Sequence, residues 1–465
     1  MSRRLCLLLL GAALLAGCGG SHSTAVETTV AAKPRAQPKP RPKPAPVRPH
    51  VRPKRVQVTV VDGYTNRRVR GVRVTIGRHA AKSDAHGVAH VALLHRGSFV
   101  AIAEKAGYAT RTVRLAFRTH PKSTIRIYRR SLEWSTYKSS PDLKVRPPFK
   151  VVWSRGLGTL IEFPAVVSQG LAFIANARGS VRAIDMRNGH LVWRHDIPHG
   201  KTASSPAVVG TTVLVHGMDG HVWALSRFDG HLLWHYTLGS PIESSPVVVH
   251  GLDLFGAWNG TVTALDLRTH RVRWRRRLGC KITSSAAVAG GTFFIGDYCG
   301  RLLALKVTNG RLRWSRSVNG RIYGTPAVSG GRVFVPSSTG GSLTAFSTRG
   351  AYLWRRSTGS YVYSSPAAAG GRVFFGSYNG VFYGLNARTG RTIWSHRTGG
   401  PISGAAVYVD GVAYAGSFSH RIVGVDARTG RVVLSFPHGE YVPVSGGGSR
   451  LLLHGFSRLY AVKHA

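Results

Sequence analysis

Three glutamates stand at equivalent places in a chain that is poor in acids. Glu162, Glu243 and Glu440 each lie two or three residues ahead of a proline that begins a short apolar segment. Convergent carboxylates can supply the oxygen ligands of a hard cation, but such a cation takes several of them. With 18 Asp and Glu against 64 Lys and Arg, each glutamate also has basic residues to pair with. Cation binding and ion pairing both stay open, and we expect no metal site.

Other constellations for catalysis are missing from the sequence. It contains no G-x-S-x-G, H-E-x-x-H or C-x-x-C motif and no phosphate-binding loop. The 21 histidines lie mostly at turns, which is typical of surface residues rather than ligands. We therefore expect no catalytic residue.

A tryptophan recurs at intervals of about forty residues through the last two-thirds of the chain. Self-similarity at this period, with four short strands in each unit, is typical of a β-propeller blade. We expect these indoles to pack between neighbouring blades rather than to stack on ligands. The series comprises Trp153, Trp193, Trp234, Trp274, Trp314, Trp354 and Trp394.

Each unit contains four apolar runs separated by turn dipeptides such as Gly370-Gly371 and Asn379-Gly380. Glycine supplies the positive φ that tight hairpins need. The turn before each tryptophan usually ends in glycine, but one unit has Thr269-His270 there. The sequence thus predicts an all-β chain, with no helix in the repeats.

Closure of the ring follows from a count of strands. The start of a first strand recurs eight times, from Pro164 to Pro443, and the last unit has room for about three strands. Lys150–Arg155 forms a spare strand ahead of the first unit. Pairing the two ends would remove the open sheet edges, so we predict an eight-bladed β-propeller over residues 150–465, with seven contiguous blades and one split blade.

The segment Gly424-Val425-Asp426-Ala427-Arg428-Thr429-Gly430 resembles the repeat of pyrroloquinoline-quinone (PQQ) propellers. That family includes quinoprotein alcohol dehydrogenases and non-catalytic lipoproteins that help to assemble outer-membrane β-barrels, so the fold alone does not decide function. Active quinoproteins hold calcium with carboxylate and amide oxygens, and many carry a disulfide between adjacent cysteines. This chain has no adjacent cysteines and few acids. We expect neither PQQ nor calcium.

One face of the predicted propeller gathers the residues of interest. The three glutamates would lie near the mouth of the central channel, with Glu440 and Glu162 in neighbouring blades. Loops on this face carry aromatic residues that are typical of interfaces, namely Tyr323, Tyr361, Tyr363 and Tyr441. Cys280 and Cys299 lie in connections on the same face, so we predict a structural disulfide between them, which an exported compartment permits.

The N-terminus resembles a bacterial lipoprotein signal. Arg3-Arg4 precedes an apolar run too short to span a bilayer, and the run ends in Leu15-Ala16-Gly17-Cys18. The resemblance implies removal of residues 1–17 and a lipid anchor on Cys18. Residues 18–54 are rich in Pro, Lys and Arg, a composition that favours an extended tether. The tether could be a plain spacer or could contact anionic headgroups or wall polymers.

Residues 55–131 alternate polar and β-branched residues and predict a separate small β-sandwich. The order of its strands and turns resembles the carboxypeptidase-regulatory-like, transthyretin-like domain, a family that implies a spacer or adhesion module without catalytic residues. Residues 132–149 are interpreted as a connector.

A formal net charge of +46 bears on partners rather than on fold. Because the chain should be exported, we expect an envelope protein or an anionic wall polymer rather than nucleic acid; composition bias is the alternative. The expected protein is a monomeric, extracytoplasmic, membrane-anchored lipoprotein with a non-catalytic binding or scaffold propeller. The alternative function is that of a divergent PQQ-dependent quinoprotein dehydrogenase.

Overall fold

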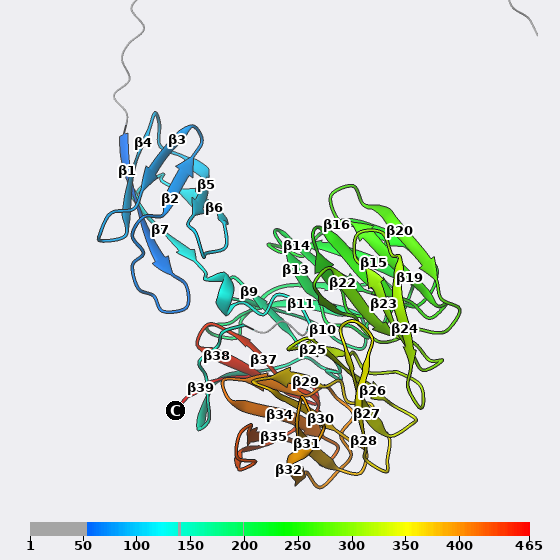
Figure 1. The fold of residues 1–465 in the computed structure, drawn as a ribbon. Helices are drawn as coiled ribbons and strands as arrows, with labels where there is room; N and C mark the ends of the chain where they lie inside the picture. The colour runs from blue at the N-terminus through cyan, green and yellow to red at the C-terminus, as the bar shows by residue number, and fades with distance from the viewer. Residues whose placement is uncertain (1–53, 138–140, 199) are drawn as a thin grey trace, which may run out of the picture. The chain divides into compact units, whose positions relative to one another are not determined.

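The computed structural model describes residues 54–137, 141–198 and 200–465. The predicted signal segment, Cys18 and almost all of the predicted tether lie outside the described residues. Figure 1 shows the described chain as a succession of short strands. Within the described part the only helix is a 3₁₀ turn, η1 (Arg130–Leu132). No helix there is long and apolar enough to cross a membrane.

Seven strands precede the repeats and form two sheets of their own. Strands β4, β1 and β7 make one sheet, in which β1 and β7 are parallel, and β3, β2, β5 and β6 make the other. Val58 of β1 and Val74 of β2 belong to one buried cluster that both sheets line. The strands are β1 (Lys54–Asp62), β2 (Arg73–Ile76), β3 (His79–Lys82), β4 (Val88–Leu93), β5 (Ser98–Glu104), β6 (Arg111–Ala116) and β7 (Lys122–Ile127).

The repeats fold as four-stranded antiparallel sheets, each built from consecutive strands, and the first four run from cyan to yellow-green in Figure 1. The first sheet is β9 (Val166–Ser168), β10 (Leu171–Ala175), β11 (Ser180–Asp185) and β12 (Leu191–Asp196). The second is β13 (Ala207–Val209), β14 (Thr212–His216), β15 (His221–Ser226) and β16 (Leu232–Thr237). The third is β17 (Val247–Val249), β18 (Leu252–Gly256), β19 (Thr261–Asp266) and β20 (Arg271–Arg277). The fourth is β21 (Ala287–Ala289), β22 (Thr292–Gly296), β23 (Arg301–Lys306) and β24 (Leu312–Ser317).

The later sheets repeat the same order. The fifth is β25 (Ala327–Ser329), β26 (Arg332–Ser337), β27 (Ser342–Ser347) and β28 (Tyr352–Ser357). The sixth is β29 (Ala367–Ala369), β30 (Arg372–Gly376), β31 (Val381–Asn386) and β32 (Thr392–Arg397). The seventh is β33 (Val407–Val409), β34 (Val412–Ser417), β35 (Arg421–Asp426) and β36 (Val432–Pro437).

One further sheet joins the two ends of the repeat region. Strands β37 (Gly439–Gly447), β38 (Arg450–Gly455) and β39 (Arg458–His464) pair in order, and β8 (Phe149–Gly156) completes the sheet beside β39. In this antiparallel pairing Tyr460 lies opposite Ser154. The strand Lys150–Arg155 therefore pairs with the C-terminal strands, as its sequence predicted, and the edge of β39 is covered.

Packing between successive sheets explains the forty-residue spacing. Trp354 donates its indole N–H to the carbonyl of Ala387 in the next sheet at 3.2 Å. A Cβ on Gly390 would meet the same indole at 2.6 Å, and its φ is +72°, so the turn requires glycine for both space and conformation. Six of the seven tryptophans donate in this way: Trp153, Trp193, Trp274, Trp314, Trp354 and Trp394.

The turn Thr269-His270 has a histidine where the other repeats have the glycine that faces the tryptophan. His270 adopts the positive φ of 57° that glycine has elsewhere, and its ring stacks on Trp234 with the centroids 4.4 Å apart. The aromatic ring thus fills the space that is left open where glycine faces the tryptophan.

The segment between η1 and β8 is more than a connector. The carbonyl of Trp134 accepts a hydrogen bond from the Val167 amide of β9 at 2.6 Å, and that of Ser135 accepts one from the Val208 amide of β13 at 2.8 Å. Trp134 is 4% exposed. These backbone contacts lay residues 134–135 along the first strands of two successive sheets and carry Tyr137 towards the site described next.

Candidate functional site

A cavity of about 370 Å³ opens among the loops that precede the first strands of the repeat sheets. Its lining residues come mainly from the connections that lead into six of the repeat sheets, together with Tyr378 from the turn after β30 and Tyr441 from β37, so it lies where those sheets converge. Glu162, Glu243, Tyr323, Tyr361, Tyr363 and Tyr441 line it together. The structure thus brings two of the three predicted glutamates and all four predicted tyrosines to one place.

Glu243 is held in the wall of the cavity by neutral donors. Its carboxylate accepts a hydrogen bond from the Tyr323 hydroxyl at 2.7 Å and another from the Trp258 indole N–H at 2.9 Å. The residue is 8% exposed. Burial and the charge of Glu243 raise the pKa of Tyr323, so the phenol stays protonated and acts as a hydrogen-bond donor to Glu243.

Glu162 faces the same space without such donors. Among the described residues its carboxylate has no hydrogen bond and no ion pair. Burial, and then the negative charge of Glu243, raise the pKa of Glu162. No cation is among the causes of this shift, and the described lining of the cavity contains no Lys or Arg.

Aromatic rings form a continuous arc beside the glutamates. Tyr323 and Tyr363 meet edge to face with centroids 5.6 Å apart, and Tyr363 meets Tyr378 at 5.0 Å. Phe418 extends the arc from Tyr378 to Tyr441, at 6.0 and 5.6 Å. Sequence analysis missed Tyr378, in the turn between β30 and β31, and Phe418, although Trp258 and Tyr298 show that aromatic residues recur at this repeat position with the forty-residue spacing.

A row of hydroxyl groups links four successive connections, and three of its members, Ser285, Thr325 and Ser365, line the cavity. The amide of Ser245 donates to Ser285 Oγ at 2.8 Å, that of Ser285 to Thr325 Oγ1 at 3.1 Å, and that of Thr325 to Ser365 Oγ at 2.9 Å. Donor and acceptor are forty residues apart in each bond, which means that they occupy equivalent places in successive repeats. Each hydroxyl therefore accepts a hydrogen bond from a buried amide of the preceding repeat. The forty-residue spacing of Ser205, Ser245, Ser285, Thr325 and Ser365 was visible in the sequence, but sequence analysis missed it.

Tyr137 belongs to this site although it comes from outside the repeats. It lines the cavity beside Thr325 and Ser365, and its ring lies edge to face with Phe163 at 6.4 Å. It also lines a second cavity of about 330 Å³ among the first strands, where most of the lining residues are Val, Ala and Pro. Tyr137 therefore stands between the two cavities. No repeat pattern could have revealed it, because residues 132–149 have no internal periodicity.

Glu440 does not join the other two glutamates. It lies on β37, outside the lining of the cavity, and its Oε2 lies 4.0 Å from His420 Nδ1. The acid that acts on Glu162 is Glu243, eighty-one positions along the chain, rather than Glu440 in the neighbouring blade.

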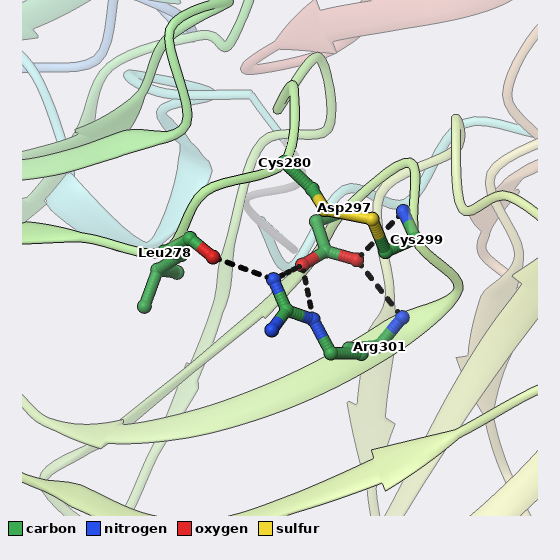
Figure 2. The surroundings of a disulfide bond; sticks show 5 residues. All are labelled: Leu278, Cys280, Asp297, Cys299 and Arg301. Atoms are coloured by element: carbon green, nitrogen blue, oxygen red, sulfur yellow. Dashed lines mark hydrogen bonds and ion pairs between the residues drawn. A yellow bond between two sulfur atoms is a disulfide. The ribbon is translucent and has the colours of Figure 1, made fainter.

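Cys280 and Cys299 are joined by a disulfide, with their Cα atoms 5.9 Å apart (Figure 2). The bond connects the loop after β20 to the turn between β22 and β23. Beneath it the buried Asp297 accepts hydrogen bonds from the Cys299 amide at 3.0 Å and from Arg301 Nε at 2.8 Å. Arg301 also donates to the carbonyl of Leu278, so the third and fourth sheets are joined by both covalent and polar contacts.

The cavity was tested against the cofactor of the quinoprotein fold. PQQ carries carboxylates and needs cationic or neutral donors, whereas this lining presents Glu162 and Glu243 and no Lys or Arg among the described residues. Nor does any group of three or more His, Cys, Asp or Glu gather at one point in the described ranges. The residues present do not fit an anionic quinone with its calcium ion.

Comparison with known proteins gives consistent matches over the repeats. The sequence profile of the family described as outer membrane protein assembly factor BamB matches residues 144–256, 258–355 and 337–440. The curated BamB of Pseudomonas aeruginosa is 28% identical over 86 residues, which are 18% of this chain. That alignment spans only 22% of the relative's length.

Solved structures show the same fold at low sequence identity. BamB from Moraxella catarrhalis superposes with a TM-score of 0.59 at 17% identity, covering 68% of this chain and 99% of that one. The quinohemoprotein alcohol dehydrogenase from Comamonas testosteroni gives 0.61 at 14% identity, covering 72% and 81%. Both an outer membrane protein assembly factor and an alcohol dehydrogenase therefore share this architecture, so the fold alone does not decide between their functions.

Proposed function

Because the chain belongs to the family described as outer membrane protein assembly factor BamB, we propose that it is a non-catalytic binding and scaffold protein of the cell envelope. In this proposal the repeats form an eight-bladed propeller that presents its loop face to an envelope protein. Cys18 carries the lipid anchor, and residues 55–131 act as a carboxypeptidase-regulatory-like spacer. The protein acts as a monomer.

The observation that carries this proposal is the arc of tyrosines around an acidic cavity on one loop face. Rigid aromatic side chains on loops suit recognition, since they offer large contact areas and have little conformational entropy to lose. Tyr361 is 50% exposed at the rim and is available to a partner.

A photo-crosslinking amino acid at position 361 should capture a discrete partner in the native envelope. The matched control is Tyr352 on β28, which is 59% exposed but lies on an outer strand away from the cavity. Adducts are resolved by gel and identified by mass spectrometry. Equal capture at both positions, or capture at 352 alone, would contradict the assignment of the face.

A second partner class is an anionic wall polymer. Strand β20 carries Arg271, Arg273, Arg275, Arg276 and Arg277, all exposed, in a chain of net charge +46. Clustered arginines attract polyanions, and this attraction weakens with salt. In the same crosslinking experiment a polymer adduct resists protease and a protein adduct does not, so the two classes are separated.

The dehydrogenase alternative is disfavoured by the same lining residues. Two glutamates without a basic partner in the cavity would repel an anionic quinone. We expect that reconstitution with PQQ and calcium, followed by absorbance and dye-reduction assays, gives neither a bound chromophore nor turnover. A bound chromophore with dye reduction would reverse the proposal in favour of the enzyme.

A further inference from the structure

The acidic cavity is an exception within a strongly basic protein. Its described lining holds two carboxylates and no Lys or Arg, although the chain has 64 basic residues. Ligand cavities begin at about 300 Å³, so a volume of about 370 Å³ accommodates the end of one long side chain rather than a folded segment.

The two glutamates differ in their hydrogen bonding. Glu243 is fixed by Tyr323 and Trp258, both neutral, so its negative charge is oriented but not neutralised. Glu162 has no polar partner among the described residues. Together they leave oxygen acceptors free for a donor that also carries positive charge, the combination that makes the shortest and strongest hydrogen bonds.

The tyrosine arc supplies the second element of a cation site. Ring faces attract cations within about 6 Å of the centroid, and the effect grows where water is excluded. Rings at the rim of the site already do this: Lys281 Nζ lies 3.3 Å from the centroid of Trp258 and 5.1 Å from that of Tyr298. Arg321 also lies over Tyr298 at 5.8 Å. Neither cation lines the cavity itself.

The net charge of the chain does not oppose this local attraction. At physiological ionic strength the Debye length is about 8 Å, so most of the dispersed arginines are screened from a group inside the cavity. The partly buried carboxylates are screened much less, and at short range they dominate the potential that an entering group meets.

From these contacts we propose that the cavity binds the ammonium or guanidinium end of a Lys or Arg side chain presented by a partner protein. The proposal rests on the envelope scaffold function and names the chemistry that its face recognises. The cation lies between Glu162 and Glu243, and its alkyl stem packs against Tyr363 and Tyr378.

Titration of the intact exported protein with short capped peptides tests the proposal. The probes are Gly-Lys-Gly and Gly-Arg-Gly, with Gly-acetyl-Lys-Gly as the neutral control and putrescine and calcium chloride as alternative cations. Calorimetry and tyrosine fluorescence should show saturable binding of the two cationic peptides and none of the acetylated one. Equal binding of the acetylated peptide, or tighter binding of putrescine or calcium than of the peptides, would overturn the assignment.

Variants locate the binding. Glu162→Gln combined with Glu243→Gln should weaken the affinity for the lysine peptide roughly tenfold or more, as expected for loss of a desolvated charge pair. Tyr363→Leu should weaken it without changing charge. Glu104→Gln, an exposed acid on β5, is the matched control and should leave the affinity unchanged. Thermal melts verify that each variant folds; if all folded variants bind as the parent does, the site is elsewhere.

Lys138 follows Tyr137 in the sequence and lies outside the described residues, so the titration is repeated with Lys138→Ala. Cation-specific binding in either chain supports the site, and its absence in both overturns it. Failure here is distinguishable from failure of the scaffold function. Capture of a partner at position 361 with no peptide binding would retain the scaffold and remove the cation site.

Discussion

Replacing His216 by alanine should lower the free energy of unfolding by about 3–5 kcal/mol. His216 on β14 and Asp253 on β18 are both fully buried, and Nε2 lies 2.9 Å from Asp253 Oδ2. Nδ1 faces the carbonyl of Ser244, so both ring nitrogens meet oxygen acceptors. Asp253 Oδ1 already lacks a partner among the described residues. Removing the ring leaves a buried carboxylate alone between the second and third sheets.

The repeat itself provides the control for this prediction. Other second strands have apolar residues at the place of Asp253, such as Val373, and glycine at the place of His216, such as Gly376. The double variant His216→Gly, Asp253→Val should therefore recover most of the loss, since an apolar replacement of a buried pair is often neutral. Urea denaturation measures all variants. A single variant as stable as the parent, or a double variant worse than His216→Ala, would contradict the prediction.

Lowering the pH should weaken the contact that His454 makes between the sheet of β37, β38, β39 and β8 and the first repeat sheet. Its Nε2 accepts a hydrogen bond from the Ala165 amide at 3.1 Å, which requires that nitrogen to be unprotonated. Burial lowers the pKa of His454 from 6.5 to about 4. Between these two pKa values His454 is protonated in the unfolded chain but not in the folded chain. The contribution of His454 to stability is therefore complete above about pH 6.5 and is lost as the pH falls towards 4. The total effect is about 3 kcal/mol.

A non-titrating acceptor isolates this contribution. His454→Gln can still accept from the Ala165 amide but cannot be protonated in this range. The free energy of unfolding is measured for both proteins from pH 7 to pH 4. We expect the difference between the two curves to change by about 3 kcal/mol in favour of the variant at low pH. Parallel curves would show that His454 does not titrate as its burial requires.

The repeat was predictable because its periodic residues act on one another locally. Six of the seven tryptophans meet the turn glycine of the next sheet, as Trp354 meets Gly390, and Trp234 meets His270 at the same place, so the same spacing recurs in sequence and in space. The strand Lys150–Arg155 was predictable for the same reason, because the repeat leaves it spare at one end and lacks a strand at the other. The cysteine pair followed from the loops that the repeat frame assigns to Cys280 and Cys299.

What the sequence by itself determined is the unit and its succession: four short strands, their turns, and the tryptophan that packs onto the next unit. Only the tertiary structure decided which loop residues share one cavity, because the convergence of distant sheets depends on how all of them stack. Glu162 therefore meets Glu243 and not Glu440. The tertiary structure also decided that Tyr137, from a segment without periodicity, lines the cavity. Backbone hydrogen bonds of the preceding residues to β9 and β13 position it there.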